Sequence, residues 1–291
     1  GGTGKTPQIE YLIRLLQDEY KLATLSRGYK RETNNFVLAN ASTTVKQLGD
    51  EPFQFFTKFP KIKVAVDANR INGITQLLKL EDKPEIILLD DAFQHRKVKA
   101  GFYILLTTYS DLFCDDFILP FGNLREPSSG KKRANMIIVT KCPSDISDHS
   151  MSKIKMKLGA DVPVFFSKIE YDELVYSEMK PIKTADLKRE EKTIVTGIAK
   201  PFPFISYLKR ENDLVLKFPD HHNFTDKEIE KIKELANNKA IITTEKDYMR
   251  LKGSLSKEQL FYLPIKSTIL KDANLLNKII LDYVGRSSRN S

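Results

Sequence analysis

Two kinds of hydrophobic pattern alternate along the first half of the chain. In one kind, apolar residues recur at helical spacing, as at 9–16 and 71–80. In the other kind, short apolar runs have almost no polar interruption, which is typical of parallel strands buried on both faces. These runs lie at residues 22–25, 63–66, 85–91, 102–106 and 136–140. Strands that alternate with helices predict an α/β fold in which a parallel sheet is flanked by helices.

The pattern is interrupted between residues 171 and 191, where the sequence is polar and rich in lysine. Beyond this segment, Thr225 and Glu228 form a capping-box pattern in front of another helical repeat. Further apolar runs, each typical of a buried strand, lie at 192–197, 214–218 and 240–244. A second series of strands and helices is therefore expected after the interruption.

The length of the chain agrees with this division. At about 150 residues per domain, 291 residues favour two domains or one large one. We predict a core domain at 1–175 and a second, smaller α/β domain at 176–291, which we expect to close over the active site.

Composition limits the kinds of partner and compartment. The 47 Lys and Arg residues against 38 Asp and Glu residues give a net charge of +9, which suits a nucleotide, a nucleic acid or an anionic membrane surface. No apolar run reaches the roughly 18 residues of a spanning helix, and no secretory signal is recognisable. Cys114 and Cys142 lack the spacing of a zinc site, so a reducing cytoplasm without structural zinc is the simplest interpretation.

The chain opens on a glycine-rich turn that ends in Lys-Thr at the start of a predicted helix. In such a turn, backbone N–H groups bind phosphate, the lysine reaches the β- and γ-phosphates, and the hydroxyl binds Mg²⁺. We predict a nucleotide-binding P-loop, with a structural turn as the alternative, at Gly1, Gly2, Thr3, Gly4, Lys5 and Thr6. Because a P-loop ordinarily follows a buried strand and no initiator Met is present, we expect further residues before Gly1.

Two pairs of acidic residues are candidates for the rest of the site. Asp90 and Asp91 end an apolar run, where a carboxylate near a P-loop reaches Mg²⁺ directly or through water. Asp50 and Glu51 lie in a turn after Gly49, where one carboxylate could act as a general base and the other as a metal ligand. The alternative for this second pair is a helix N-terminus stabilised by acids.

Histidine and arginine supply the remaining candidates. His221 lies in a polar cluster after Asp220, where a histidine can orient a carboxylate base, although loop histidines are more often solvated. The guanidinium fork of arginine matches phosphate geometry, so three arginines are candidate clamps for substrate oxygens, with ordinary surface positions as the alternative. They are Arg27, Arg96 and Arg125.

Taken together, these segments resemble the tetraacyldisaccharide 4′-kinase family, the lipid A 4′-kinases of Gram-negative bacteria. The most specific segment is Asp-Asp-Ala-Phe-Gln-His-Arg at 90–96. The ordered set, which spans nearly the whole chain, lies at 1–7, 26–29, 49–52, 90–96, 124–127, 196–199, 218–222 and 244–247. Family members carry a membrane-engaging helix and the first core strand before the P-loop, in agreement with the expectation of residues before Gly1.

The resemblance implies an enzyme that transfers the γ-phosphoryl group of ATP to the 4′-hydroxyl of a tetraacylated glucosamine disaccharide 1-phosphate, which gives lipid IVA. By the same resemblance, Asp50 is the general base and His221, directly after Asp220 in the family motif, is its partner. Lys5 holds the β- and γ-phosphates. The Mg²⁺ shell is formed by Thr6, Glu51, Asp90 and Asp91.

The implied location is the cytoplasmic face of the bacterial inner membrane, where the enzyme is peripheral and needs neither nucleic acid nor an obligate protein partner. Two other classes of protein share some of these features. A P-loop ATPase or GTPase switch would use the positive charge to bind a partner, but the guanine-reading pattern Asn/Thr-Lys-x-Asp is only approached, at residues 244–247. A basic membrane-surface module without catalysis would not need the candidate catalytic residues.

Overall fold

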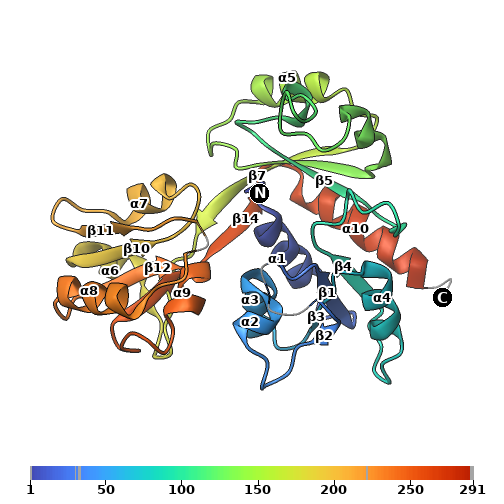
Figure 1. The fold of residues 1–291 in the computed structure, drawn as a ribbon. Helices are drawn as coiled ribbons and strands as arrows, with labels where there is room; N and C mark the ends of the chain where they lie inside the picture. The colour runs from blue at the N-terminus through green and yellow to red at the C-terminus, as the bar shows by residue number, and fades with distance from the viewer. Residues whose placement is uncertain (1, 30, 32–33, 221, 289–291) are drawn as a thin grey trace. The chain divides into compact units, whose positions relative to one another are not determined.

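The computed structural model describes residues 2–29, 31, 34–220 and 222–288, and Figure 1 shows the fold. The chain forms two compact units: unit 1 consists of Gly1–Glu170 and Lys266–Ser291, and unit 2 consists of Tyr171–Ile265. The sequence assigned everything after residue 175 to the second domain, whereas residues 266–291 return to unit 1. The physical reason is helix α10 (Ala273–Ser288), which buries an apolar stripe in the same core as helix α1 (Lys5–Leu16).

The first sheet of unit 1 has the strand order β2-β3-β1-β4. Strand β1 is parallel to β3 and to β4, while the short β2 is antiparallel to β3. The strands are β1 (Leu22–Ser26), β2 (Val37–Leu38), β3 (Lys63–Val66) and β4 (Ile86–Leu89). The helices of this part, besides α1, are α2 (Val45–Leu48), α3 (Asp50–Lys58) and α4 (Arg70–Leu78).

The second sheet of unit 1 has the order β14-β7-β6-β5, with β5, β6 and β7 parallel. Its strands are β5 (Ile104–Thr108), β6 (Met136–Thr140), β7 (Val164–Tyr171) and β14 (Ile265–Ile269). Helix α5 (Asp148–Leu158) and the short 3-10 turns η1 (Phe113–Asp115) and η2 (Ser128–Arg133) belong to this part. Strands β7 and β14 carry the chain into unit 2 and back, so unit 2 is an insertion in the sequence of unit 1.

Unit 2 is built on a parallel sheet of order β11-β10-β12-β13. Its strands are β10 (Lys192–Thr196), β11 (Leu214–Lys217), β12 (Ala240–Thr244) and β13 (Leu260–Leu263), with a separate pair β8 (Leu174–Val175) and β9 (Ile182–Lys183). Its helices are α6 (Thr184–Arg189), α7 (Phe202–Leu208), α8 (Asp226–Ala236) and α9 (Glu245–Leu251). The predicted α/β fold with a second α/β series is confirmed, and Thr225 and Glu228 form the predicted capping box of α8.

Candidate active site

The P-loop leads directly into helix α1. Gly2 and Gly4 both have φ of 84°, a left-handed conformation that glycine adopts without steric cost, and Gly4 is the N-cap of the helix. Gly4 has no side chain with which to cap the helix, and the first N–H groups of such a helix can bind an anion. The hydroxyl of Thr140, at the end of β6, donates to the carbonyl oxygen of Thr3 at 2.7 Å and fixes the turn to the sheet. Gly1 lies outside the described residues.

The structure brings Lys5 to the carboxyl end of β4. Its Nζ lies 3.4 Å from Oδ1 of Asp91, and both side chains are accessible to solvent. Asp91 has φ of 52°, which is uncommon for a residue other than glycine, although short polar residues tolerate it best. Lys5, predicted to bind phosphate, and Asp91, predicted to bind the metal, are therefore neighbours.

Asp90 is the buried member of the acidic pair, with 6% of its surface exposed. Burial, followed by the negative charge of Glu51, raises the pKa of Asp90 to about 6, while the charge of Lys5 acts in the opposite direction. Ser26 donates a long hydrogen bond of 3.4 Å to Oδ2. Asp90 therefore lies close enough to Glu51 and Asp91 for the three carboxylates to repel one another, which is an environment that a cation would stabilise.

The donor set at this place suits Mg²⁺. Carboxylate and hydroxyl oxygens are its preferred ligands, and Mg²⁺ sites in phosphotransferases commonly use only one or two carboxylates together with water and substrate phosphates. Among the residues that the structure describes, no three His, Cys, Asp or Glu side chains are arranged to hold a metal ion by themselves. Asp90 with one acidic neighbour supplies the one or two carboxylates that such a site uses, and Thr6, the residue after Lys5 in α1, is the candidate hydroxyl ligand.

The turn that carries Asp50 and Glu51 packs against the segment that follows β1. Gly49 has φ of 88°, and a Cβ atom built on it would lie 3.2 Å from the carbonyl oxygen of Tyr29. Asp50 and Glu51 occupy the first turn of α3, as the alternative interpretation of acids at a helix N-terminus requires. Glu51 also lies within electrostatic range of Asp90, and its role as a metal ligand stays a prediction.

Arg70 is a buried residue at this site that sequence reasoning missed. Its guanidinium donates to the carbonyl oxygen of Asp67 at 2.8 Å and to that of Asp90 at 3.2 Å, and its Nε has no hydrogen-bond partner among the described residues. Burial lowers its pKa, and Arg27 lies close enough to lower it further. The available signal was Asp67 at the end of a predicted strand, three residues before an arginine that opens a helix.

The three predicted arginine clamps lie in different surroundings. Arg27 is near the buried Arg70 and therefore belongs to the P-loop site. Arg96 is exposed and pairs with Glu126 at 3.1 Å, and Arg133 binds the same carboxylate at 2.7 Å. Arg96 and Arg133 also line a cavity of about 560 Å³ with Val98, Lys99 and Tyr103. Arg125 is exposed on the segment before Glu126.

In unit 2, His221 lies outside the described residues, but both of its neighbours are held in place. Asp220 Oδ1 lies 3.4 Å from Nζ of Lys246. The ring of His222 stacks on Phe218, with centroids 5.0 Å apart, and its Nε2 lies 3.0 Å from both carboxylate oxygens of Glu228. His222 therefore has a structural partner already.

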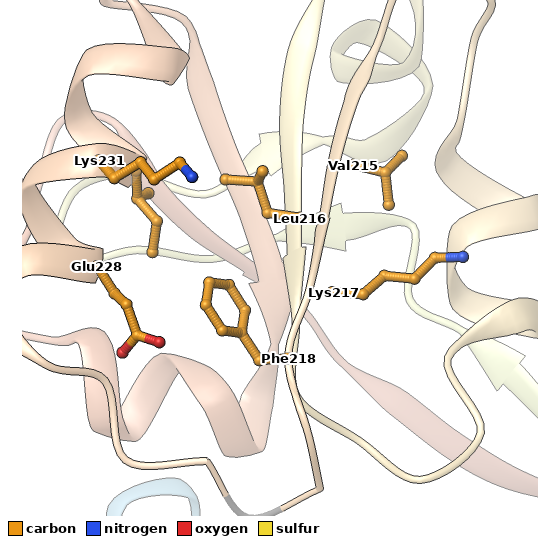
Figure 2. Close-up of a pocket in the computed structure, with 7 residues that line it drawn as sticks. Val215, Leu216, Lys217, Phe218, Glu228 and Lys231 are labelled. Carbon is orange, nitrogen blue, oxygen red and sulfur yellow. The ribbon is translucent and has the colours of Figure 1, made fainter.

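Phe218 and Glu228 also border a pocket of about 290 Å³ between β11 and α8, and Figure 2 shows the two side chains beside each other. Lys217 and Lys231 supply its cationic side chains. None of the predicted site residues that the structure describes lines this pocket.

Helix α9 contacts the residues on both sides of position 221. Arg250 donates to the carbonyl oxygen of His222 at 3.4 Å and lies 3.6 Å from Oδ1 of the fully buried Asp247. Oδ2 of Asp247 accepts from the N–H of Gly197 at 2.8 Å. A Cβ atom on Gly197 would lie 3.1 Å from the carbonyl oxygen of Pro219 and 3.2 Å from Asp247, so a larger residue here would require these neighbours to shift.

Comparison with known proteins agrees with this arrangement. The family described as tetraacyldisaccharide-1-P 4′-kinase matches residues 1–284. A tetraacyldisaccharide 4′-kinase of Flavobacterium johnsoniae is 58% identical over 98% of this chain and 84% of its own length, and one of Bacteroides thetaiotaomicron is 44% identical over 100% of this chain and 83% of its own length.

Among solved structures, the "apo" form of LpxK from Aquifex aeolicus in complex with ATP superimposes with a TM-score of 0.76 at 28% identity. The match covers 98% of this chain and 85% of the other. A family match over nearly the whole chain, relatives of high identity and a shared fold all agree. The chain therefore belongs to the tetraacyldisaccharide-1-P 4′-kinase family.

Proposed function

We propose that this protein transfers the γ-phosphoryl group of ATP to the 4′-hydroxyl of a tetraacylated glucosamine disaccharide 1-phosphate, which gives lipid IVA in lipid A biosynthesis. The observation that carries the proposal is the position of Lys5, at a helix N-terminus without a side-chain cap, beside Asp91 and the buried Asp90. A cation, free N–H donors and carboxylates at one place are the elements that phosphoryl transfer requires.

In this proposal, Lys5 holds the β- and γ-phosphates with the N–H groups of the P-loop. Thr6 and Asp90, with Glu51 or Asp91, hold Mg²⁺. The metal supplies charge neutralisation on the phosphate oxygens when it is bound. The Lys5–Asp91 pair supports this assignment. The ammonium of Lys5 already lies 3.4 Å from a carboxylate, and a phosphate could replace that carboxylate as its anionic partner.

The acceptor side of the reaction is assigned to Asp50 and His221. Asp50 takes the proton of the attacking hydroxyl, and His221 orients it. The structural support is indirect: Asp50 starts α3 next to Glu51, and the residues on both sides of position 221 are held by α8 and α9. His222 is bound to Glu228, which agrees with the choice of His221.

A lipid acceptor implies work at a membrane surface, and we propose the cytoplasmic face of the inner membrane as the location. No helix of the described part of the chain is long and apolar enough to cross a bilayer. The absence of a nucleic-acid partner and of an obligate protein partner, and the closing of the second domain over the active site, stay predictions.

The test is a transfer assay with γ-labelled ATP and detergent-dispersed tetraacyldisaccharide 1-phosphate. We expect label on the lipid with the wild-type protein and none with Lys5→Ala. Asp50→Asn should lower kcat by roughly 10²-fold or more while ATP binding stays within about twofold. Release of labelled phosphate at the same rate with and without the lipid would instead favour the nucleotide-hydrolysing switch.

A further inference from the structure

Residues 116–124, which we call the apolar loop, expose an unusual run of large apolar side chains in unit 1. Phe117 is 70% exposed, Ile118 44%, Leu119 59% and Phe121 90%. The other large apolar side chains of comparable exposure in the described residues are never adjacent in sequence. Scattered exposed apolar residues are ordinary, but a contiguous group marks an interaction surface.

The apolar loop is a folded structure whose backbone forms its own hydrogen bonds. The N–H of Leu119 donates to the carbonyl oxygen of Leu124 at 2.9 Å, and the N–H of Leu124 donates to that of Phe117 at 3.0 Å. The N–H of Phe121 donates to the carbonyl oxygen of Ile118 at 3.0 Å. The four apolar side chains are therefore presented outward by a loop with a defined shape.

The base of the loop is equally well fixed. The carboxylate of Asp116 accepts from the N–H of Phe117 at 2.8 Å and from the N–H of Asn123 at 3.0 Å. A Cβ atom on Gly122 would lie 2.3 Å from both Asp116 Oδ1 and the carbonyl oxygen of Phe117, so this position admits only glycine. Asp115 and Lys157 form an ion pair of 2.6 Å beside this base.

The exposed apolar side chains and the internally bonded backbone together suit a loop that lies in a lipid interface. Backbone groups that enter a lipid environment must be bonded inside the protein, and the loop already meets this condition for several of its N–H groups. The segment that follows carries two exposed cationic residues, Arg125 and Lys132. Cationic side chains next to apolar ones suit an anionic bilayer surface, as does the net charge of +9.

We propose that the apolar loop inserts Phe117, Ile118, Leu119 and Phe121 into the interface of an anionic lipid bilayer and so holds unit 1 on the membrane. The proposal rests on the proposed function, because a lipid acceptor gives the enzyme a reason to be there. It names a contact surface and a partner that the transfer reaction by itself does not require.

The chain contains no tryptophan, which allows a single fluorescent probe. We would compare Phe121→Trp with Phe202→Trp, a matched control at a 77% exposed position in α7 of unit 2. On vesicles of phosphatidylethanolamine and phosphatidylglycerol, the emission of Phe121→Trp should shift to the blue and be quenched by brominated lipid. The emission of Phe202→Trp should not change. Equal behaviour of the two probes would overturn the proposal.

Vesicle co-sedimentation measures the contribution of the side chains. Phe121→Ser should weaken partition into the vesicles about tenfold, and Phe117→Ser by a similar factor, whereas Phe202→Ser should leave partition unchanged. Gly122→Ala, which distorts the loop without removing an apolar group, should also weaken partition. Unchanged vesicle binding in Phe121→Ser, or a change only in the self-association of the protein, would assign the loop to another role.

Transfer to a detergent-dispersed acceptor separates this proposal from the proposed function. Phe117→Ser and Phe121→Ser should retain wild-type kcat in detergent and lose activity only on vesicles, whereas Phe202→Ser should retain activity in both. Vesicle binding that depends on Phe121 in a protein without transfer activity would refute the proposed function alone. Transfer activity with vesicle binding that is indifferent to Phe121 would refute the role of the apolar loop alone.

Discussion

Asp90 gives a prediction in which stability and activity oppose each other. Its pKa rises from the ordinary 3.8 to about 6, chiefly through burial. The shift is about two units, and each unit corresponds to 1.36 kcal/mol, so keeping this carboxylate ionised costs the folded protein about 3 kcal/mol at pH 7. We therefore expect Asp90→Asn to be more stable than the wild type by up to about 3 kcal/mol and inactive in transfer.

The sign of the pH dependence follows from the direction of the shift. Between pH 3.8 and about 6, folded Asp90 binds a proton more tightly than unfolded Asp90 does, so the wild type loses stability as pH rises through this window. Above about pH 6 the loss is complete. The advantage of Asp90→Asn should accordingly be largest at pH 7 to 8 and disappear near pH 4.

The assay is urea unfolding of wild type and Asp90→Asn across this pH range, with Asp91→Asn as the control. Asp91 is an exposed neighbour of Asp90 with a left-handed backbone conformation, which asparagine also tolerates. Its replacement should therefore change the free energy of unfolding by less than about 0.5 kcal/mol. Mg²⁺ with ATP should stabilise the wild type and have a much smaller effect on Asp90→Asn. An Asp90→Asn protein less stable than wild type at pH 7, or a difference independent of pH, would refute the reasoning.

Two further predictions concern unit 2. Gly197→Ala should displace the backbone near Pro219 and so lower kcat by about tenfold to a hundredfold, with little change in ATP binding. Steady-state kinetics measures kcat, and equilibrium titration measures ATP binding. An unchanged kcat would contradict this prediction. Lys192 and Asp213 form a fully buried ion pair of 2.7 Å, so Asp213→Ala should cost about 3–5 kcal/mol in urea unfolding, and Lys192→Met in the same protein should recover much of that loss. Equal instability of the single and double variants would show that the unpaired charge is not the cause.

Most of the strands could be predicted because buried parallel strands leave an uninterrupted apolar run. The run at 136–140 coincides with β6, and the run at 22–25 lies within β1. The strand predicted at 102–106 is found at Ile104–Thr108, since Phe102 leaves the ladder and packs on Tyr283 of α10. That contact depends on a segment about 180 residues away, which periodicity cannot detect.

The return of residues 266–291 to unit 1 could not be predicted for a related reason. An amphipathic helix shows which of its faces is apolar, but not which sheet covers that face. Strands β7, β13 and β14 were also missed. Polar residues interrupt the apolar run of β7 and of β14, and β13 lies only one residue from β14.

At the site, a Gly-rich turn that ends in Lys-Thr and an apolar strand that ends in two aspartates were enough to predict that Lys5, Asp90 and Asp91 are neighbours. The burial of Arg70 could not be predicted, since an arginine at a helix start is usually on the surface and its environment here depends on Asp67 and the backbone of Asp90. Residue type and spacing were therefore enough to place Lys5 and Asp91 together, whereas the place of Arg70 depends on contacts that the sequence does not show.

Transfer of phosphate to the 4′-hydroxyl is tested most directly with two acceptors that differ in one atom. With tetraacyldisaccharide 1-phosphate and γ-labelled ATP, we expect one labelled phosphate on the lipid, at the 4′-oxygen. With the analogue in which hydrogen replaces the 4′-hydroxyl, we expect no labelled lipid. Label on the 4′-deoxy analogue, or no transfer to the natural acceptor by protein that binds ATP, would show that the enzyme does not phosphorylate this hydroxyl.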